Sequence, residues 1–392
     1  MSTKHSKAAA EFLKNKKQAA WHDETLWLVR AKRDRLSKEV PEWEELRNMA
    51  CATKLYSNSH LDELLVEFEN NARANGAHVY WAKDADEYCN IVYNILNQHG
   101  VKHFIKSKSM LAEECELNPF LENKGIEVVE SDLGERILQL MHLKPSHIVL
   151  PAIHIKREQV GELFEREMGT EKGNFDPTYL THAARKNLRQ KFIHAEAAMT
   201  GANFAVASTG EIVVCTNEGN ADMGTSQPKL QIAAFGMEKI VPDRESLGVF
   251  TRLLARSATG QPITTYTSHY RKPREGGELH IIIVDNGRSK ILADQKHIKT
   301  LNCIRCGACM NTCPVYRRSG GYSYTYFIPG PIGINLGMLK APLHYYDNVS
   351  ACSLCYSCSF VCPAKVDLAE QIYLWRQDLD KLGKADRMKR VM

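Results

Sequence analysis

The chain has 392 residues, 44% of them hydrophobic and 25% charged, a composition typical of soluble globular proteins with two or three domains. Its 51 basic and 46 acidic residues give a net charge of +5, which lacks the strong basic excess expected of a nucleic-acid-binding protein. No apolar run approaches the roughly 20 residues of a membrane-spanning helix, and the lysine-rich start lacks the apolar segment of a secretory signal, so we expect a cytoplasmic protein that makes at most peripheral contact with a membrane.

Residues 1–70 are predicted to form a helical N-terminal segment. Apolar residues recur there at three- and four-residue steps among Lys, Arg and Glu. Pro41 should interrupt the pattern, with a second helix from Trp43. Two interpretations stay open: a docking arm for a partner or an anionic surface, and a solvated helix packed on the domain behind it.

Residues 71–290 alternate short β-rich runs with helical ones, the pattern of βαβ units and a parallel sheet. The first predicted strands are 78–82, 102–105, 125–129 and 147–152, with helices at 85–98 and 132–140. A longer helix is expected over 182–200. Three later runs, 202–207, 211–216 and 230–235, indicate a meander or a sheet extension, and the last strands are predicted at 265–269 and 279–285.

This middle segment contains neither a glycine-rich dinucleotide fingerprint nor a P-loop, so it offers no support for a bound nicotinamide, flavin or nucleotide. Glycines end two of its short β-runs, where they let backbone amides approach an anion closely. With their polar neighbours they form a candidate ligand pocket: Thr209, Gly210, Asn217, Glu218, Gly219 and Asn220. A plain hairpin turn explains the same residues equally well.

The remaining reactive side chains indicate no further site. The 15 histidines form no HExxH or close metal-ligand set, so His154, His182 and His194 are expected to be surface or packed residues. The basic run 185–191 is interpreted either as a guide for a carboxylate substrate or acidic partner, or as a solvated helix face. Four isolated cysteines are expected to be small buried side chains: Cys51, Cys89, Cys115 and Cys215.

Residues 291–392, the third predicted domain, contain the other eight of the 12 cysteines in two blocks of identical spacing. The blocks are Cys303-x2-Cys306-x2-Cys309-x3-Cys313-Pro314 and Cys352-x2-Cys355-x2-Cys358-x3-Cys362-Pro363. This run is the ferredoxin form of a 4Fe-4S site, in which the fourth cysteine ligates the other cluster. We therefore assign Cys303, Cys306, Cys309 and Cys362 to one cluster, and Cys352, Cys355, Cys358 and Cys313 to the second.

Disulfides and zinc are the alternatives for these cysteines. Cytosolic thiols are kept reduced, and four-cysteine zinc sites usually pair two CxxC units across a longer loop, so iron–sulfur clusters are favoured.

The 38 residues between the blocks exceed what a compact bacterial ferredoxin uses. The module resembles the helical ferredoxin modules of succinate dehydrogenase and heterodisulfide reductase complexes, and its aromatic-rich insertion is interpreted as a shield for a cluster or a docking surface. Beyond the second block, Asp367 and Glu370 resemble a capping box that starts a helix running to about Leu382, where Gly383 stops it.

Several motifs together resemble the LutB-type lactate-utilization iron–sulfur proteins. They are Gly201-Ala-Asn-Phe204, Ser208-Thr-Gly210, Thr216-Asn-Glu-Gly-Asn220 and Gly236-x-Glu-Lys-x-Val-Pro242, followed by the two ferredoxin blocks. The resemblance runs through most of the chain. It implies an α/β LUD domain, similar to the sugar-phosphate isomerase and CoA-transferase-like group, joined to a helical ferredoxin domain. Such proteins commonly continue past the second block, so a partner-binding C-terminal segment is expected to be missing or trimmed here.

The resemblance also implies a system that oxidises L-lactate to pyruvate. Its two other members would be a second LUD-domain protein and a cysteine-rich-domain iron–sulfur subunit. We therefore expect an electron-transfer subunit that relays the two electrons of lactate oxidation singly through two 4Fe-4S clusters. Two alternatives stay open: a small-molecule enzyme with Glu218 as acid/base and clusters that are structural or redox-sensing, and a scaffold whose clusters only hold an interaction surface.

Overall fold

The computed structural model describes residues 4–384, so the first three residues of the predicted helical segment lie outside the described part. Four helices come first: α1 Lys4–Lys14, α2 Lys16–Lys38, α3 Trp43–Ser59 and α4 Leu61–Ala74. As predicted, Pro41 lies in the turn between α2 and α3. Leu26 of α2 is fully buried, and the guanidinium of Arg33 donates to the carbonyl oxygen of Val361 (2.9 Å). Helix α2 therefore packs on the rest of the chain, as the second interpretation expects.

Six parallel strands form the central sheet in the order β1-β10-β7-β4-β2-β3. Their bounds are β1 His78–Ala82, β2 His103–Lys106, β3 Glu127–Glu130, β4 Ala197–Gly201, β7 Leu230–Gly236 and β10 Glu278–Val284. Strand β7 is buried over its whole length and β10 over all but its first residue, as expected for parallel strands covered on both faces. The predicted parallel sheet is confirmed.

A smaller sheet lies beside it, in the order β8-β5-β6-β9. It consists of β5 Phe204–Val206, β6 Glu211–Thr216, β8 Ile240–Val241 and β9 Tyr266–Tyr270. Strand β6 is antiparallel to both β5 and β9, whereas β5 and β8 are parallel. This second sheet is separate from the central one, so the three runs form neither a single meander nor an extension of the parallel sheet: the first two are β5 and β6, and the third is β7 of the central sheet.

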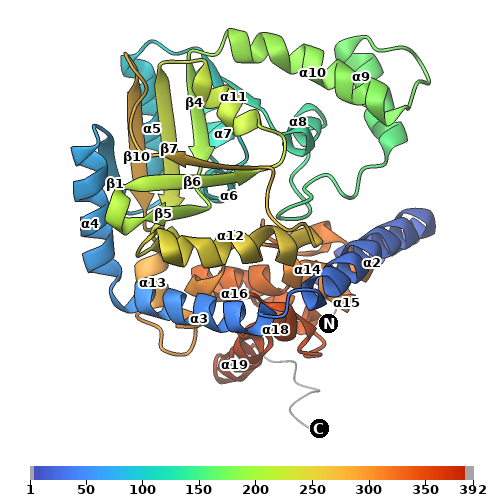
Figure 1. Cartoon of the computed structure of the whole chain (residues 1–392). Coiled ribbons are helices and arrows are strands. Elements are labelled where there is room, and N and C mark those ends of the chain that lie inside the picture. Colours follow the sequence, from blue (N-terminus) through green and yellow to red (C-terminus); the bar gives the residue numbers. More distant parts are fainter. Residues whose placement is uncertain (1–3, 385–392) are drawn as a thin grey trace.

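Helices cover both faces of the central sheet (Figure 1). One face packs against α5 Ala85–Gln98, α6 Met110–Glu114 and α7 Leu117–Glu122, and the other against α4 and the smaller sheet. The remaining helices of this part are α8 Leu133–Leu140, α9 Arg157–Met168, α10 Pro177–Ile193, α11 Asn220–Ser226, α12 Arg244–Thr259 and α13 Arg288–Leu292. Helix α12 lies between the smaller sheet and the C-terminal helices, and it also contacts α2 and α3.

The C-terminal part is helical. Its helices are α14 Ala308–Thr312, α15 Pro314–Ser319, α16 Gly330–Lys340, α17 Pro342–Tyr345, α18 Ser357–Val361 and α19 Leu368–Lys381. Helix α16, in the insertion between the cysteine blocks, is buried from Gly330 to Met338 and packs against α14 and α19. The insertion thus supplies a large share of the core of this part. Among residues 4–384, no helix is both long and apolar enough to cross a membrane.

Two predicted elements are wrong. Residues 147–152 form turns and bends, not a strand, because the Ser146 amide donates to the Pro151 carbonyl oxygen (3.0 Å) and Ile148 packs into the core of the C-terminal helices. The predicted helix 182–200 is instead α10, capped by Asp176, followed by β4. Small apolar residues in β4 fit between β2 and β7, so burial overrides their helical pattern.

The C-terminal helix forms as predicted, and Gly383 follows it with a φ of 68°. Its predicted capping box is wrong. Asp367 adopts a φ of 60° and its side chain makes no capping hydrogen bond. The Ser359 hydroxyl accepts the amide of Ala369 in its place (3.0 Å). Helices α9 and α12 are not among the predicted elements.

Candidate functional site

The two cysteine blocks adopt the same backbone conformation. In each loop the residues before and after the second cysteine have positive φ: Arg305 and Gly307 in the first, Leu354 and Tyr356 in the second. The conformation aims the Arg305 amide at the Cys303 sulfur (3.4 Å) and the Leu354 amide at the Cys352 sulfur (3.3 Å). Backbone amides turned inward in this way form an anion-binding concavity. Both loops are therefore shaped to bind negatively charged sulfur.

The fourth cysteine of each block also receives an amide hydrogen bond. The sulfur of Cys313 accepts from Tyr316 (3.5 Å), and the sulfur of Cys362 accepts from Val366 (3.4 Å). Each of these cysteines directly precedes a proline. The repeat of sequence is thus a repeat of structure.

The structure brings the eight thiols together in two crossed sets. A small cavity is lined by three cysteines of the first block and the last of the second: Cys303, Cys306, Cys309 and Cys362. Burial, and to a smaller extent Cys352 and Cys355, raises the pKa of the Cys313 thiol to about 11. The neighbouring Cys313, Cys352 and Cys355 likewise add to the effect of burial in raising the pKa of Cys358. Cys313 therefore lies with the second block.

These thiols fit 4Fe-4S clusters better than they fit free thiols or disulfides. None of the 12 cysteines is in a disulfide. Burial raises the pKa of Cys306 to about 12, so thiolates grouped here need the compensating charge of a bound metal. Cysteine thiolates are the ligands that iron–sulfur clusters use, and the inward amides stabilise their charge.

The two sets differ in exposure. Cys306 and Cys309 are buried, whereas Cys355 is exposed. In the second block the large apolar side chain of Phe360 is 74% exposed, and Tyr356 is also exposed. The second set thus lies near the surface and the first lies inside the molecule.

A cavity of about 260 Å³ opens next to the first set. It lies at the carboxyl ends of the parallel strands, where open α/β sheets bind ligands. Segments that follow β2, β4 and β7 line it, together with α12 and the first cysteine loop. Ile148 and Cys306 line both this cavity and the small one formed by the thiols. The cavity and the first set of thiols therefore share a wall.

Charged side chains line part of the cavity. The guanidinium of Arg288 bonds to the carboxylates of Glu238 and Glu114, the latter at 3.0 Å. Arg305 of the first cysteine loop approaches Glu238 at 3.6 Å. Burial alone would raise the pKa of Glu238, but Arg288 and Arg305 hold it at about 2. The cysteine loop is therefore tied to the cavity by a buried ion-pair network.

One cation of the cavity has no partner. Lys239 lines the cavity and makes no ion pair or hydrogen bond through its ammonium group with the described residues. Burial lowers its pKa to about 8. An unpaired ammonium group beside a cavity attracts an anion.

The predicted pocket is split between two places. Asn217, Glu218 and Asn220 line the cavity. Thr209 and Gly210 lie at the other end of β6, where the Asn75 side chain donates to the Thr209 carbonyl oxygen (2.8 Å). Gly219, with a φ of 67°, forms the turn before α11. The structure thus brings three of the six residues together.

Sequence reasoning missed the cationic residues of the cavity. Lys239 belongs to the Gly236–Pro242 motif that carries the family resemblance, so that motif could have indicated it as a site residue. Arg288 and Arg305 stand alone in sequence and are brought together only by the fold.

The other predicted side chains have ordinary surroundings. His154 packs between Ser146 and Tyr322, and burial lowers its pKa to about 4. His182 and His194 are exposed, and the run 185–191 lies on α10, mostly as an exposed helix face. Of the isolated cysteines, two are buried and two are partly buried: Cys89 and Cys115, and Cys51 and Cys215.

The expectation that no histidines form a close set is wrong for His78 and His280. They lie opposite each other on β1 and β10, with Glu278 beside them.

Two known protein families match successive parts of the chain. The LUD domain matches residues 65–291, and the 4Fe-4S dicluster domain matches residues 299–366. Lactate utilization protein B of Geobacillus thermodenitrificans is 43% identical over 357 residues, which cover 89% of this chain and 75% of the relative. The uncharacterized electron transport protein YkgF of Escherichia coli K12 is 41% identical over 362 residues, 91% of this chain and 76% of the relative. A solved structure of a DUF162 family protein from Deinococcus radiodurans shares 16% identity at a TM-score of 0.33, covering 57% of this chain and 98% of that one.

Proposed function

Because the chain belongs to the lactate utilization protein B family, with a LUD domain joined to a 4Fe-4S dicluster domain, we propose that it is the iron–sulfur electron-transfer subunit of a system that oxidises L-lactate to pyruvate. When bound, two 4Fe-4S clusters supply a pair of one-electron centres, so the two electrons of lactate oxidation are relayed singly. The two crossed sets of cysteines are the proposed ligands.

The observation that carries this proposal is the shared wall between the cavity and the first set of thiols. Cys306 lines both spaces, so a ligand in the cavity lies beside the first set. The second set lies near the surface, where Cys355 and Phe360 are exposed. This arrangement supports a path on which electrons enter at the cluster beside the cavity and leave to a partner from the cluster of the second cysteine block.

We assign the cavity as the ligand pocket and a small carboxylate as its ligand. Lys239 supplies the unpaired positive charge, and Asn217, Glu218 and Asn220 supply polar groups at the turn. Arg305 holds the first cysteine loop against the same pocket through Glu238. A few convergent polar groups in a concave site are the usual form of a small-molecule pocket.

The proposed partners are a second LUD-domain protein and a cysteine-rich-domain iron–sulfur subunit. The names of the relatives, which refer to lactate utilization and electron transport, support a multi-protein system. We place the system in the cytoplasm, because thiols that ligate clusters must stay reduced.

The proposal is tested with the anaerobically purified, cluster-loaded chain, alone and with the proposed partners. L-lactate is expected to bleach the visible absorbance of the oxidised clusters only when the partners are present. Lactate oxidation by the chain alone, with an artificial acceptor, would show an independent enzyme. Clusters that keep their redox state in the active complex would show a scaffold. Either result contradicts the proposal.

Replacing Lys239 with methionine is expected to slow lactate-dependent cluster reduction in the complex about tenfold or more, because a charge-assisted hydrogen bond to the ligand is lost. Lys239, with a pKa near 8, is protonated below that pH, so the wild-type rate should fall as the pH rises through about 8. The variant should lack this fall. Stopped-flow absorbance across the pH range measures both.

Lys290→Met is the matched control, because Lys290 is exposed on α13 and does not line the cavity. Glu218→Gln and Asn220→Ala test the turn, and we expect lost activity with intact clusters and an unchanged melting temperature for Glu218→Gln. Full activity in both turn variants would leave this segment as a plain hairpin. Full activity in Lys239→Met would show that the cavity is not the ligand pocket.

A further inference from the structure

Three histidines and one glutamate gather at the amino ends of β1 and β10. His78 and His280 are register partners in these parallel strands, and Glu278 precedes His280 by two residues on the same face. His99, directly after α5, completes the group. These residues come from three segments of the chain: β1, the end of α5 and β10.

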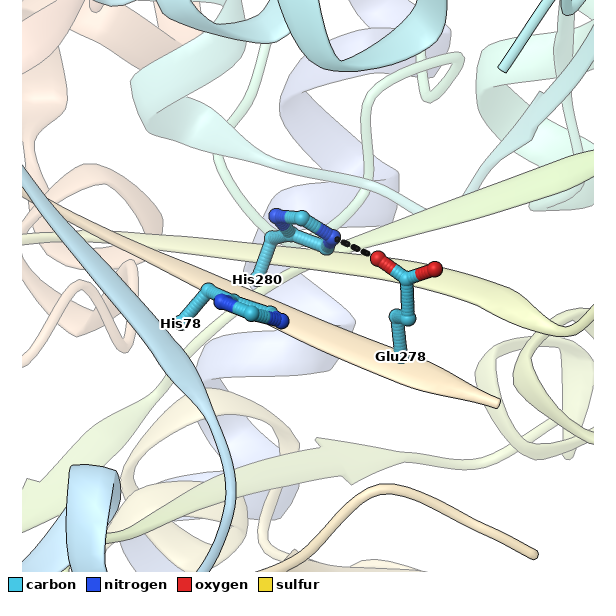
Figure 2. A group of neighbouring side chains, drawn as sticks. All are labelled: His78, Glu278 and His280. Carbon is cyan, nitrogen blue, oxygen red and sulfur yellow. Dashed lines mark hydrogen bonds and ion pairs between the residues drawn. The ribbon is translucent and has the colours of Figure 1, made fainter. Parts of the chain in front are cut away.

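The side chains point toward one another, as Figure 2 shows for His78, Glu278 and His280. One nitrogen or oxygen from each of these three lies within 4.8 Å of the others. The same carboxylate oxygen of Glu278 lies 3.0 Å from Nε2 of His280 and 3.5 Å from Nε2 of His99. Two imidazole nitrogens thus converge on one carboxylate oxygen, with a third imidazole beside them.

A further contact orients the buried member of the group. The hydroxyl of Tyr80 lies 3.1 Å from Nδ1 of His280. Only 5% of His280 is exposed, so its ring is held between this hydroxyl and the carboxylate. Metal-bound histidines typically engage an oxygen partner through their second ring nitrogen, which fixes the ring and the tautomer. Nε2 is thereby left facing Glu278 and the other histidines.

We propose that His78, His280 and Glu278 bind a divalent transition-metal cation of the zinc type, with His99 as a fourth ligand. Imidazole nitrogen and carboxylate oxygen are the ligands such cations take, and tetrahedral coordination uses four. Small side-chain rotations bring the ligand atoms to coordination distance, because three of the four residues, His78, His99 and Glu278, are exposed.

A second histidine–glutamate pair, also at the amino ends of two strands but on β2 and β3, shows what distinguishes the site. His103 lies 2.8 Å from Glu127, but the ammonium group of Lys191 lies 2.5 Å from the same carboxylate. There a lysine supplies the positive charge and only one imidazole is present. At Glu278 no lysine or arginine contacts the carboxylate in residues 4–384, and two imidazoles do.

The site is separate from the cavity and the cysteines. It lies at the amino end of β10, whereas Gly236 on the neighbouring β7 lines the cavity at the carboxyl end. Strand β10 has seven residues at a rise of about 3.3 Å each, so its amino and carboxyl ends are roughly 20 Å apart. We therefore assign the cation a structural role, joining β1, β10 and the end of α5.

The test is equilibrium dialysis of the cluster-loaded chain against limiting free Zn²⁺, with metal analysis by mass spectrometry. Cluster loading occupies the eight clustered thiols, so added zinc reports on other sites. We expect about one zinc per chain beyond the iron content. His78→Gln and His280→Gln should each weaken zinc binding at least about 100-fold, and Tyr80→Phe about tenfold, as outer-shell partners do.

His103→Gln is the matched control and should bind zinc like the wild type. Since His78 is exposed, its variant keeps the fold, and zinc should raise the melting temperature of the wild type but not of His78→Gln. Absence of zinc from the wild-type chain at equilibrium overturns the proposal. Undiminished zinc binding in both His78→Gln and His280→Gln overturns it as well.

Discussion

Replacing Cys313 with serine is expected to remove the cluster bound by Cys352, Cys355 and Cys358. The cluster bound by the other three cysteines of the mutated block should remain. The reason is spatial: the Cys313 thiol lies with the second block, and Cys362 lines the cavity of the first. The iron content should fall from about eight to about four per chain. Anaerobic iron and sulfide analysis, with electron paramagnetic resonance of the reduced protein, measures the loss and identifies the surviving centre.

The reciprocal variant Cys362→Ser sharpens this test, because it should remove the buried centre next to the cavity. The two variants should therefore give complementary spectra. Cys215→Ser, which alters an isolated cysteine, should keep all the iron. If Cys313→Ser loses instead the centre held by Cys303, Cys306 and Cys309, the crossed assignment is wrong.

Glu238→Gln is expected to destabilise the protein by about 3 kcal/mol or more. Glutamine keeps the volume of the side chain but leaves the guanidinium of Arg305, whose side chain is 11% exposed, without its carboxylate partner. Because Arg305 also belongs to the first cysteine loop, the variant should also retain the first cluster less well. Denaturant unfolding under anaerobic conditions, together with iron analysis after unfolding and refolding, measures both effects.

The pH dependence gives this prediction a second readout. The pKa of Glu238 is about 2 in the folded protein and about 4.3 in an unfolded chain, so its stabilisation is complete above about pH 4.5 and is lost as the pH falls toward 2. The stability difference between the wild type and Glu238→Gln should shrink over that range. Glu218→Gln, at an exposed carboxylate, should change stability little. Equal unfolding of Glu238→Gln and the wild type at neutral pH would contradict the predicted network.

The parts of the site that sequence could predict are those encoded locally. The cysteine spacing fixes which residues can turn inward, and both blocks fold alike, with amides of Arg305 and Leu354 on the sulfurs. The strand pattern predicted β1, β6 and β10 closely, because alternation and β-branched runs are local properties.

The parts that sequence missed depend on strand order and on burial. His78 and His280 are 202 positions apart, and only the pairing of β1 with β10 makes them neighbours. Lys239, Arg288 and Arg305 meet in one cavity for the same reason. Residues 147–152 read as a strand because they are apolar, but that apolar surface packs into the C-terminal core.

The packing of α2 bears on the order in which the chain folds during synthesis. Arg33 donates to Val361 and Arg47 to the carbonyl oxygen of Cys362, contacts that span 328 and 315 positions. The first helices made by the ribosome thus find these partners only after the second cysteine block has emerged. Helix α2 also contacts α12, α14 and α15, so the apolar surface around Leu26 stays exposed to other nascent chains until these later helices have been made. Such non-local contacts slow folding, so completion of the N-terminal helices should be among the last events of synthesis.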